Sequence, residues 1–166
     1  METVFKFDFL KEKARKKIKK YLEKTVGSHS RKELLLIGAL LHDIAKTDLL
    51  VKESTGFTNC PGHEIIGSLM VEKFSSRFTL DKKAEDFVKR IVCFHGFVNN
   101  ILTLVIKRKN IVKYFGFFKQ AVGDIYLELL LLMYADILGS DLKKLLPQEY
   151  QLRIKTIVKL LNKSLV

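Results

Sequence analysis

His42 and Asp43 stand side by side at the end of an apolar run, in the stretch LLLIGALLHDIAKTD at residues 34–48. An ionised carboxylate in apolar surroundings is costly unless it is paired or bound to a metal ion. A second aspartate, Asp136, interrupts the apolar run LELLLLMYADILGSDL. Both aspartates are therefore candidates for buried carboxylates that hold a metal ion.

All four histidines lie between residues 29 and 95, and His42, His63 and His95 stand at predicted helix ends or inside apolar runs. Taken singly, each is more typical of a core histidine bound to a carbonyl, but beside the His-Asp pair they favour a metal site. Nitrogen and oxygen ligands from different helices suit Mn, Fe, Co, Ni or Zn, with Mg less suited. Cys60 and Cys93 do not have the spacing of a structural zinc site.

The composition predicts one compact domain over residues 1–166. The chain is 48% hydrophobic and 29% charged, with 2 Pro and 9 Gly. Its longest charge-free stretch, residues 91–106, is shorter than the ~20 apolar residues of a membrane span, and early charges exclude a signal peptide. We therefore expect a cytoplasmic protein without a membrane segment. The net charge of +12 favours polyanionic partners.

Helical periodicity runs through most of the chain. Residues 8–24 predict a basic amphipathic helix, and Ser30 with Glu33 predicts a capping box that starts a second helix, which we expect to reach Ala45. Residues 46–62 predict a long loop, and the next helix opens at His63.

The second half of the chain continues the pattern. A helix over residues 81–96 is expected to end at Gly96, and residues 98–109 are expected to be irregular or weakly helical. Two further helices separate near Gly123, and Pro147 opens the last one. The sequence thus predicts an all-α bundle of about six or seven helices, with no second domain.

The stretch LLLIGALLHDIAKTD resembles the signature of the HD superfamily of metal-dependent phosphohydrolases. The segments GFTNCPGHEIIGSLMVEKF, VKRIVCFHGF and YLELLLLMYADILGSDL, in that order, most resemble the HD region of bacterial CCA-adding tRNA nucleotidyltransferases. The similarity covers about residues 31–142. It implies a single HD-type helical domain in which His42, Asp43 and Asp136 are primary ligands of a divalent metal, while His63 and His95 bind a second metal or substrate phosphate.

Two departures from the family pattern matter. The nucleotidyltransferase head has no counterpart in this chain, so CCA addition is not expected. The family's first histidine is also missing from residues 8–25, and Glu12, His29 or a water molecule could fill its place.

The resemblance and the residue types together predict hydrolysis of a phosphomonoester or phosphodiester in a nucleotide or a phosphorylated RNA end. A divalent ion would activate water, Asp43 would help hold it, and His63 or His95 could protonate the leaving oxygen. Lys46 could neutralise the phosphate or only complement a helix dipole. The alternative is a non-catalytic module with a degraded metal site, which binds RNA or a protein through its basic helices.

Overall fold

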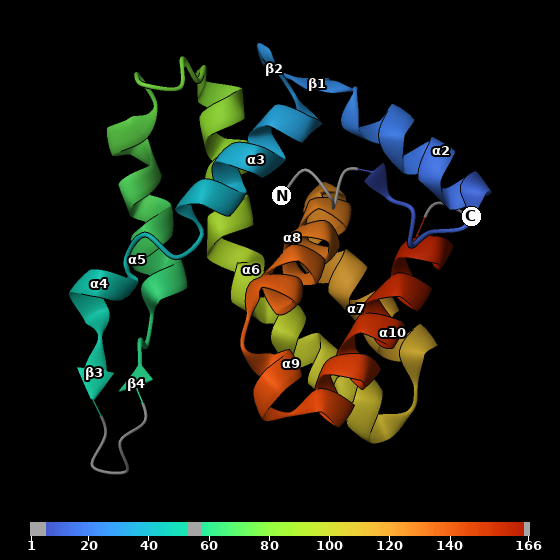
Figure 1. Ribbon diagram of the computed structural model, residues 1–166. Helices are drawn as coiled ribbons and strands as arrows, with labels where there is room; N and C mark the ends of the chain where they lie inside the picture. The colour runs from blue at the N-terminus through green and yellow to red at the C-terminus, as the bar shows by residue number, and fades with distance from the viewer. Residues whose placement is uncertain (1–5, 53–57, 165–166) are drawn as a thin grey trace. The chain divides into compact units, whose positions relative to one another are not determined.

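The computed structural model describes residues 6–52 and 58–164 of the chain, which form two compact units (Figure 1). One, the site unit, comprises Lys24–His95. The other, the terminal unit, combines the residues up to Glu23 with those from Gly96 onward. The described residues are mostly helical, with strands confined to two short hairpins, which confirms the predicted all-α class, and seven of their helices have eight or more residues.

The site unit is built from short helices and two small hairpins that surround the first half of the longest helix. In the β1–β2 hairpin Thr25 pairs with Ser30, and in β3–β4 Val51 pairs with Asn59. The elements are β1 (Thr25–Val26), β2 (His29–Ser30), α3 (Arg31–Leu41), α4 (Lys46–Leu49), β3 (Val51–Lys52), β4 (Thr58–Asn59), α5 (His63–Met70), η1 (Val71–Phe74) and α6 (Lys82–Arg108). The predicted loop over residues 46–62 was therefore wrong in part, since it contains α4 and the β3–β4 hairpin.

The capping box predicted at the start of α3 is confirmed. The Ser30 hydroxyl accepts a hydrogen bond from the Glu33 N–H, and the Glu33 carboxylate accepts one from the Ser30 N–H. This exchange satisfies two backbone donors that the first turn of a helix otherwise leaves without partners. It fixes the residue at which α3 begins.

Gly38 lets α3 approach α6 closely. A Cβ atom built on Gly38 would lie 2.7 Å from Cγ2 of Ile91, a residue one helical turn before His95. Gly67 on α5 makes a similar approach, since its Cβ would lie 3.2 Å from Cγ1 of Val92. Both helices therefore pack on the part of α6 that carries His95.

α6 does not end at Gly96, as the sequence predicted, but continues to Arg108. Residues 98–108, nearly all of the stretch expected to be irregular or weakly helical, form its second half, where Val98, Ile101, Leu102 and Val105 are buried. Their burial offsets the cost of about 1 kcal/mol that a glycine in the middle of a helix carries relative to alanine.

Within the described residues, α6 is also the one helix long and apolar enough, by length and composition, to cross a membrane. Core helices of soluble proteins pass the same test, and the side chains of Val88, Ile91 and Val92 are fully buried. That the chain lacks a membrane segment stays a prediction.

The terminal unit is a helical bundle around α8, which is buried on nearly all sides. The aromatic ring of Phe9 stacks on that of Tyr134, with ring centroids 4.0 Å apart. The helices are α2 (Glu12–Leu22), the second half of α6, α7 (Ile111–Val122), η2 (Gly123–Ile125), α8 (Tyr126–Gly139), α9 (Leu142–Leu145) and α10 (Pro147–Lys163). The predicted separation near Gly123 and the predicted start at Pro147 are both confirmed.

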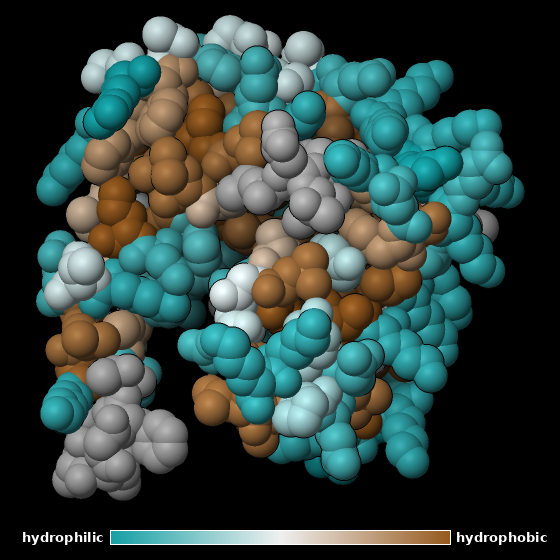
Figure 2. Space-filling view, viewed as in Figure 1, coloured by the Kyte–Doolittle hydropathy of each residue, from teal (hydrophilic) through white to brown (hydrophobic). Residues whose placement is uncertain are grey.

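α2 packs on this bundle through one apolar side. Ala14, Ile18 and Leu22 are buried, and the Tyr21 hydroxyl donates a hydrogen bond of 2.7 Å to the Asp124 carbonyl. The opposite side of the helix is hydrophilic, as the surface over α2 in Figure 2 shows. The predicted amphipathic helix is thus confirmed, somewhat shorter than the expected residues 8–24.

Candidate metal site

The His-Asp pair lies in a turn just beyond α3. The helix ends at Leu41 and His42 is its C-cap, so the expectation that it reaches Ala45 was wrong. The backbone turns instead, with the Ile44 N–H donating to the Leu41 carbonyl and the Lys46 N–H donating to the Asp43 carbonyl. Both side chains are half-buried, with 19% of the His42 side chain and 35% of the Asp43 side chain exposed.

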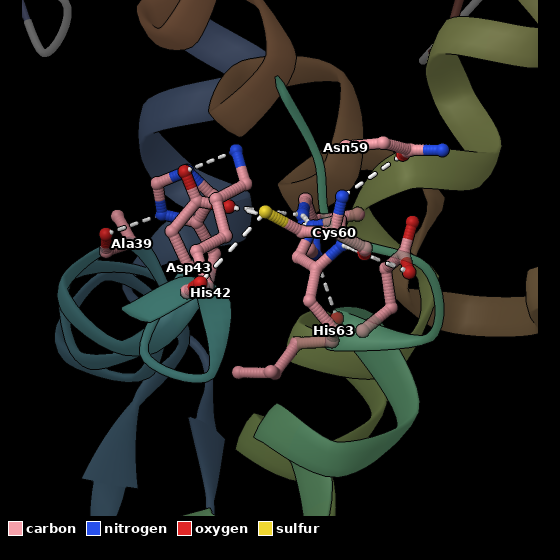
Figure 3. A network of polar contacts seen from close by, with 10 residues as sticks. Ala39, His42, Asp43, Asn59, Cys60 and His63 are labelled. Atoms are coloured by element: carbon pink, nitrogen blue, oxygen red, sulfur yellow. Dashed lines mark hydrogen bonds and ion pairs between the residues drawn. The ribbon is translucent and has the colours of Figure 1, made fainter. Parts of the chain in front are cut away.

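His63 and His95 reach the same place from two other helices. Gly62 adopts a left-handed conformation with φ of 77°, which turns the chain so that α5 starts at His63. His95 lies on α6 and is buried. Figure 3 shows His63 and Cys60 facing His42 and Asp43 across the site.

The three histidines share one hydrogen-bonding pattern. In each ring Nδ1 contacts the backbone carbonyl three residues earlier, at 2.7 to 2.8 Å. The accepting carbonyls belong to Ala39, Cys60 and Val92. Because a carbonyl oxygen can only accept, each Nδ1 carries a proton, and the neutral form of such a ring has its lone pair on Nε2. Histidines that bind metals in proteins are oriented in the same way.

The Nε2 atoms converge on the Asp43 carboxylate. His63 Nε2 lies 3.6 Å and His95 Nε2 3.5 Å from Asp43 Oδ1, and the two nitrogens are 3.2 Å apart. His42 Nε2 lies 3.3 Å from the other oxygen, Oδ2. Asp43 Oδ1 is buried and receives no hydrogen bond from the described residues. Two imidazole nitrogens therefore lie beside a buried carboxylate oxygen that lacks a hydrogen bond, an arrangement that a cation between them would stabilise.

The carboxylate itself is held in its ionised form. Burial raises the pKa of Asp43, but the neighbouring His42, His95 and Lys46 side chains lower it further, so that it lies well below its usual range. The Lys46 ammonium group donates a hydrogen bond of 2.8 Å to Oδ2. Asp43 therefore carries a full negative charge at neutral pH, as a metal ligand must.

One atom from each of Asp43, His63 and His95 lies within 4.8 Å of the other two, so the site unit by itself contains a potential three-ligand metal site. His42 lies beside this group. Nitrogen and carboxylate donors suit the transition metals that the sequence predicted. Both His63 and His95 direct Nε2 at the carboxylate, which agrees with a ligand role; their predicted role as proton donors stays a prediction.

The remaining predicted residues belong to other elements of the chain. Asp136 belongs to the last turn of α8 in the terminal unit, where its side chain is exposed, so the predicted burial was wrong. Its role as a metal ligand stays a prediction. His29 lies in the β1–β2 hairpin, separated from the His-Asp pair by α3, which is about 16 Å long. It therefore does not fill the position of the missing first histidine. Glu12 is exposed on α2, where its carboxylate pairs with Lys16.

Two features of the site were not predicted from the sequence. The carboxylate of Glu64 lies 3.2 Å from His63 Nδ1, beside the Cys60 carbonyl, and so supports the ring from outside the site. The pairing of Lys46 with Asp43 was also missed. The adjacency of His63 and Glu64 in the sequence was a signal for the first contact. The contact between Lys46 and Asp43 had no such signal, because it depends on the turn after α3.

Comparison with protein families matches residues 13–141 to the HD domain. No curated protein matches the chain. The match spans more than half of the sequence and includes the His-Asp pair, so the chain belongs to the HD domain family. Membership of this family places the chain in a superfamily of metal-dependent phosphohydrolases. The group of Asp43, His63 and His95, called the acceptor cluster below, agrees with a metal-binding site.

Proposed function

We propose that this protein hydrolyses a phosphomonoester or phosphodiester in a nucleotide or a phosphorylated RNA end, using a divalent metal ion. The observation that carries the proposal is the convergence of Asp43 Oδ1, His63 Nε2 and His95 Nε2 within 4.8 Å of one another, with the buried Asp43 Oδ1 lacking a hydrogen bond from the described residues. The choice of substrate is supported by the resemblance to the HD region of CCA-adding enzymes and by the net charge of +12.

Asp43, His63 and His95 would hold the ion, and His42 and Asp136 would complete the set that the family resemblance implies. When bound there, a divalent ion polarises a phosphoryl oxygen and lowers the pKa of water. The protein supplies rigid ligands, because each histidine ring is fixed by its Nδ1 hydrogen bond to the backbone. The protein also supplies a negative charge, since the ionised Asp43 attracts the cation.

Lys46 gives the site a cation of its own. Its side chain is 45% exposed and bonded to Asp43 Oδ2, so it orients the carboxylate while leaving part of the ammonium group open to solvent. An ammonium group has three donors, and the remaining ones can bind a substrate phosphate. This supports the phosphate-binding role over that of a helix-dipole partner.

Hydrolysis assays on chelator-treated protein test the proposal. On addition of Mn²⁺, Co²⁺ or Ni²⁺, we expect one of two results. The protein releases p-nitrophenol from a p-nitrophenyl phosphomonoester or phosphodiester, or it releases phosphate from nucleotides or from RNA with a 5′- or 3′-phosphate. The Asp43→Asn variant should be inactive with every metal, whereas Asp48→Asn, an equivalent change at an exposed aspartate of α4, should retain activity. Inactivity of the wild type across the panel, with metal bound, would favour the non-catalytic alternative.

The role of Asp136 needs a separate variant. Asp136→Asn should reduce activity and raise the metal concentration required for half-maximal rate, because a carboxylate ligand becomes a neutral amide. The control is Asp141→Asn, at the start of α9, where the aspartate pairs with Lys144 on the surface. Undiminished activity and metal dependence in Asp136→Asn would remove this residue from the ligand set.

A further inference from the structure

The outward side of α2 carries five exposed lysines. We call this surface the α2 basic face; it consists of Lys13, Lys16, Lys17, Lys19 and Lys20. Residues 11–24 contain eight basic side chains and two acidic ones, Glu12 and Glu23. The surface belongs to the terminal unit, whereas the acceptor cluster belongs to the site unit.

Most of the positive charge on this face is not neutralised by the protein. Lys16 pairs with Glu12 at 2.7 Å. Lys13, Lys19 and Lys20 form no ion pair with any residue that the structure describes. Lysines three and four positions apart lie on one side of a helix, so their ammonium groups form a row along α2. Such a row attracts a polyanion that presents several charges in line.

The packing of α2 indicates what kind of polyanion this is. A helix that binds a membrane surface inserts an apolar side into the lipid. In α2 that side is already occupied, because Ala14, Ile18 and Leu22 are buried in the protein. The exposed side is therefore free only for electrostatic contact. Lysine is a flexible point charge that suits phosphate groups without requiring a fixed geometry.

We propose that the α2 basic face binds the phosphate backbone of a nucleic acid. Binding of this kind releases condensed counterions, so its affinity falls with salt, with a log-log slope of roughly 0.7 to 0.9 for each phosphate contact. Loss of three lysine contacts should reduce the slope by about 2 to 3. Between about 50 and 200 mM salt, the wild type should then lose ~20- to 40-fold more affinity than a variant without these contacts.

Fluorescence anisotropy of a short labelled RNA, and of DNA with the same sequence, tests the proposal. The test variant is Lys13→Gln/Lys19→Gln/Lys20→Gln. The control variant is Lys73→Gln/Lys83→Gln/Lys143→Gln, which removes the same charge from exposed lysines elsewhere. We expect the test variant to show the flatter salt dependence and the control to resemble the wild type. Comparison of RNA with DNA shows which nucleic acid the surface prefers.

Three results would overturn the proposal: undetectable or salt-insensitive binding of both probes, equal slopes for the two variants, or binding to vesicles of anionic phospholipid without binding to either nucleic acid. The replaced lysines are exposed, and their loss should leave thermal unfolding unchanged. The proposal does not depend on phosphohydrolase activity. Failure of the hydrolysis assays would leave the anisotropy result unaffected, and metal binding should be the same in both variants.

Discussion

Gly38→Ala should disturb the contact between α3 and α6 on which the metal site depends. The added Cβ would lie 2.7 Å from Ile91 Cγ2, and the branched Ile91 side chain has little rotamer freedom in a helix. Overpacking of this kind costs about 1 to 3 kcal/mol. Alanine also gains about 0.5 to 1 kcal/mol over glycine in a helix, so the substitution should destabilise the protein only moderately.

Gly116→Ala on α7 is the matched control, because its Cβ would meet no atom within 4 Å. It gains the same helix propensity without the clash, so the two variants should differ by about 1 to 3 kcal/mol in free energy of unfolding. For a chain of this size, that is about 2–12 °C in Tm. Since Ile91 lies one turn before His95, Gly38→Ala should also weaken metal affinity. Equal changes in stability and metal affinity for both variants would refute the reasoning.

Three further outcomes are expected in urea unfolding. Hydrogen bonds from Lys89, Lys82 and Ser75 lower the pKa of Glu85 to about 2. The ionised Glu85 carboxylate therefore stabilises the folded state above about pH 4.5, and this contribution is lost as the pH falls toward 2. Glu85→Gln should therefore cost about 1 to 2 kcal/mol at pH 7 and progressively less below pH 4.5; a constant difference would contradict this. Ser30→Ala should cost about 1 kcal/mol by removing the α3 capping box, and an unchanged stability would show that the cap contributes nothing. Gly62→Ala should cost about 1 to 2 kcal/mol because its φ is 77°, and a neutral effect would mean that the turn before His63 relaxes.

Helix starts were predictable where one side chain determines them locally. Ser30 with Glu33 marked the start of α3, and Pro147 marked the start of α10, because a capping hydroxyl and a fixed φ act within a single turn. The histidines of the site could also be named from the sequence, since buried imidazole beside a carboxylate is unusual. Their convergence within one unit could not be predicted, because it depends on the packing of α3 and α5 on α6.

Helix ends were less predictable. Gly96 has the weak helix propensity of a terminator, yet the burial of residues beyond it keeps α6 continuous. No Gly, Pro or Asn lies between His42 and Ala45, so the sequence contained no signal for the end of α3 at Leu41. The role considered for His29 failed for a geometric reason, since the length of α3 separates the hairpin from the His-Asp pair.

Calorimetric titration of chelator-treated protein with Mn²⁺ and with Zn²⁺ tests the central claim most directly, because it measures the ion without requiring the substrate. The wild type should bind about one ion per chain, as should the Asp48→Asn control. Asp43→Asn should lose that binding, because the neutral amide replaces the one charged ligand of the cluster. Unchanged affinity in Asp43→Asn would contradict the assignment of Asp43, His63 and His95 as the metal site.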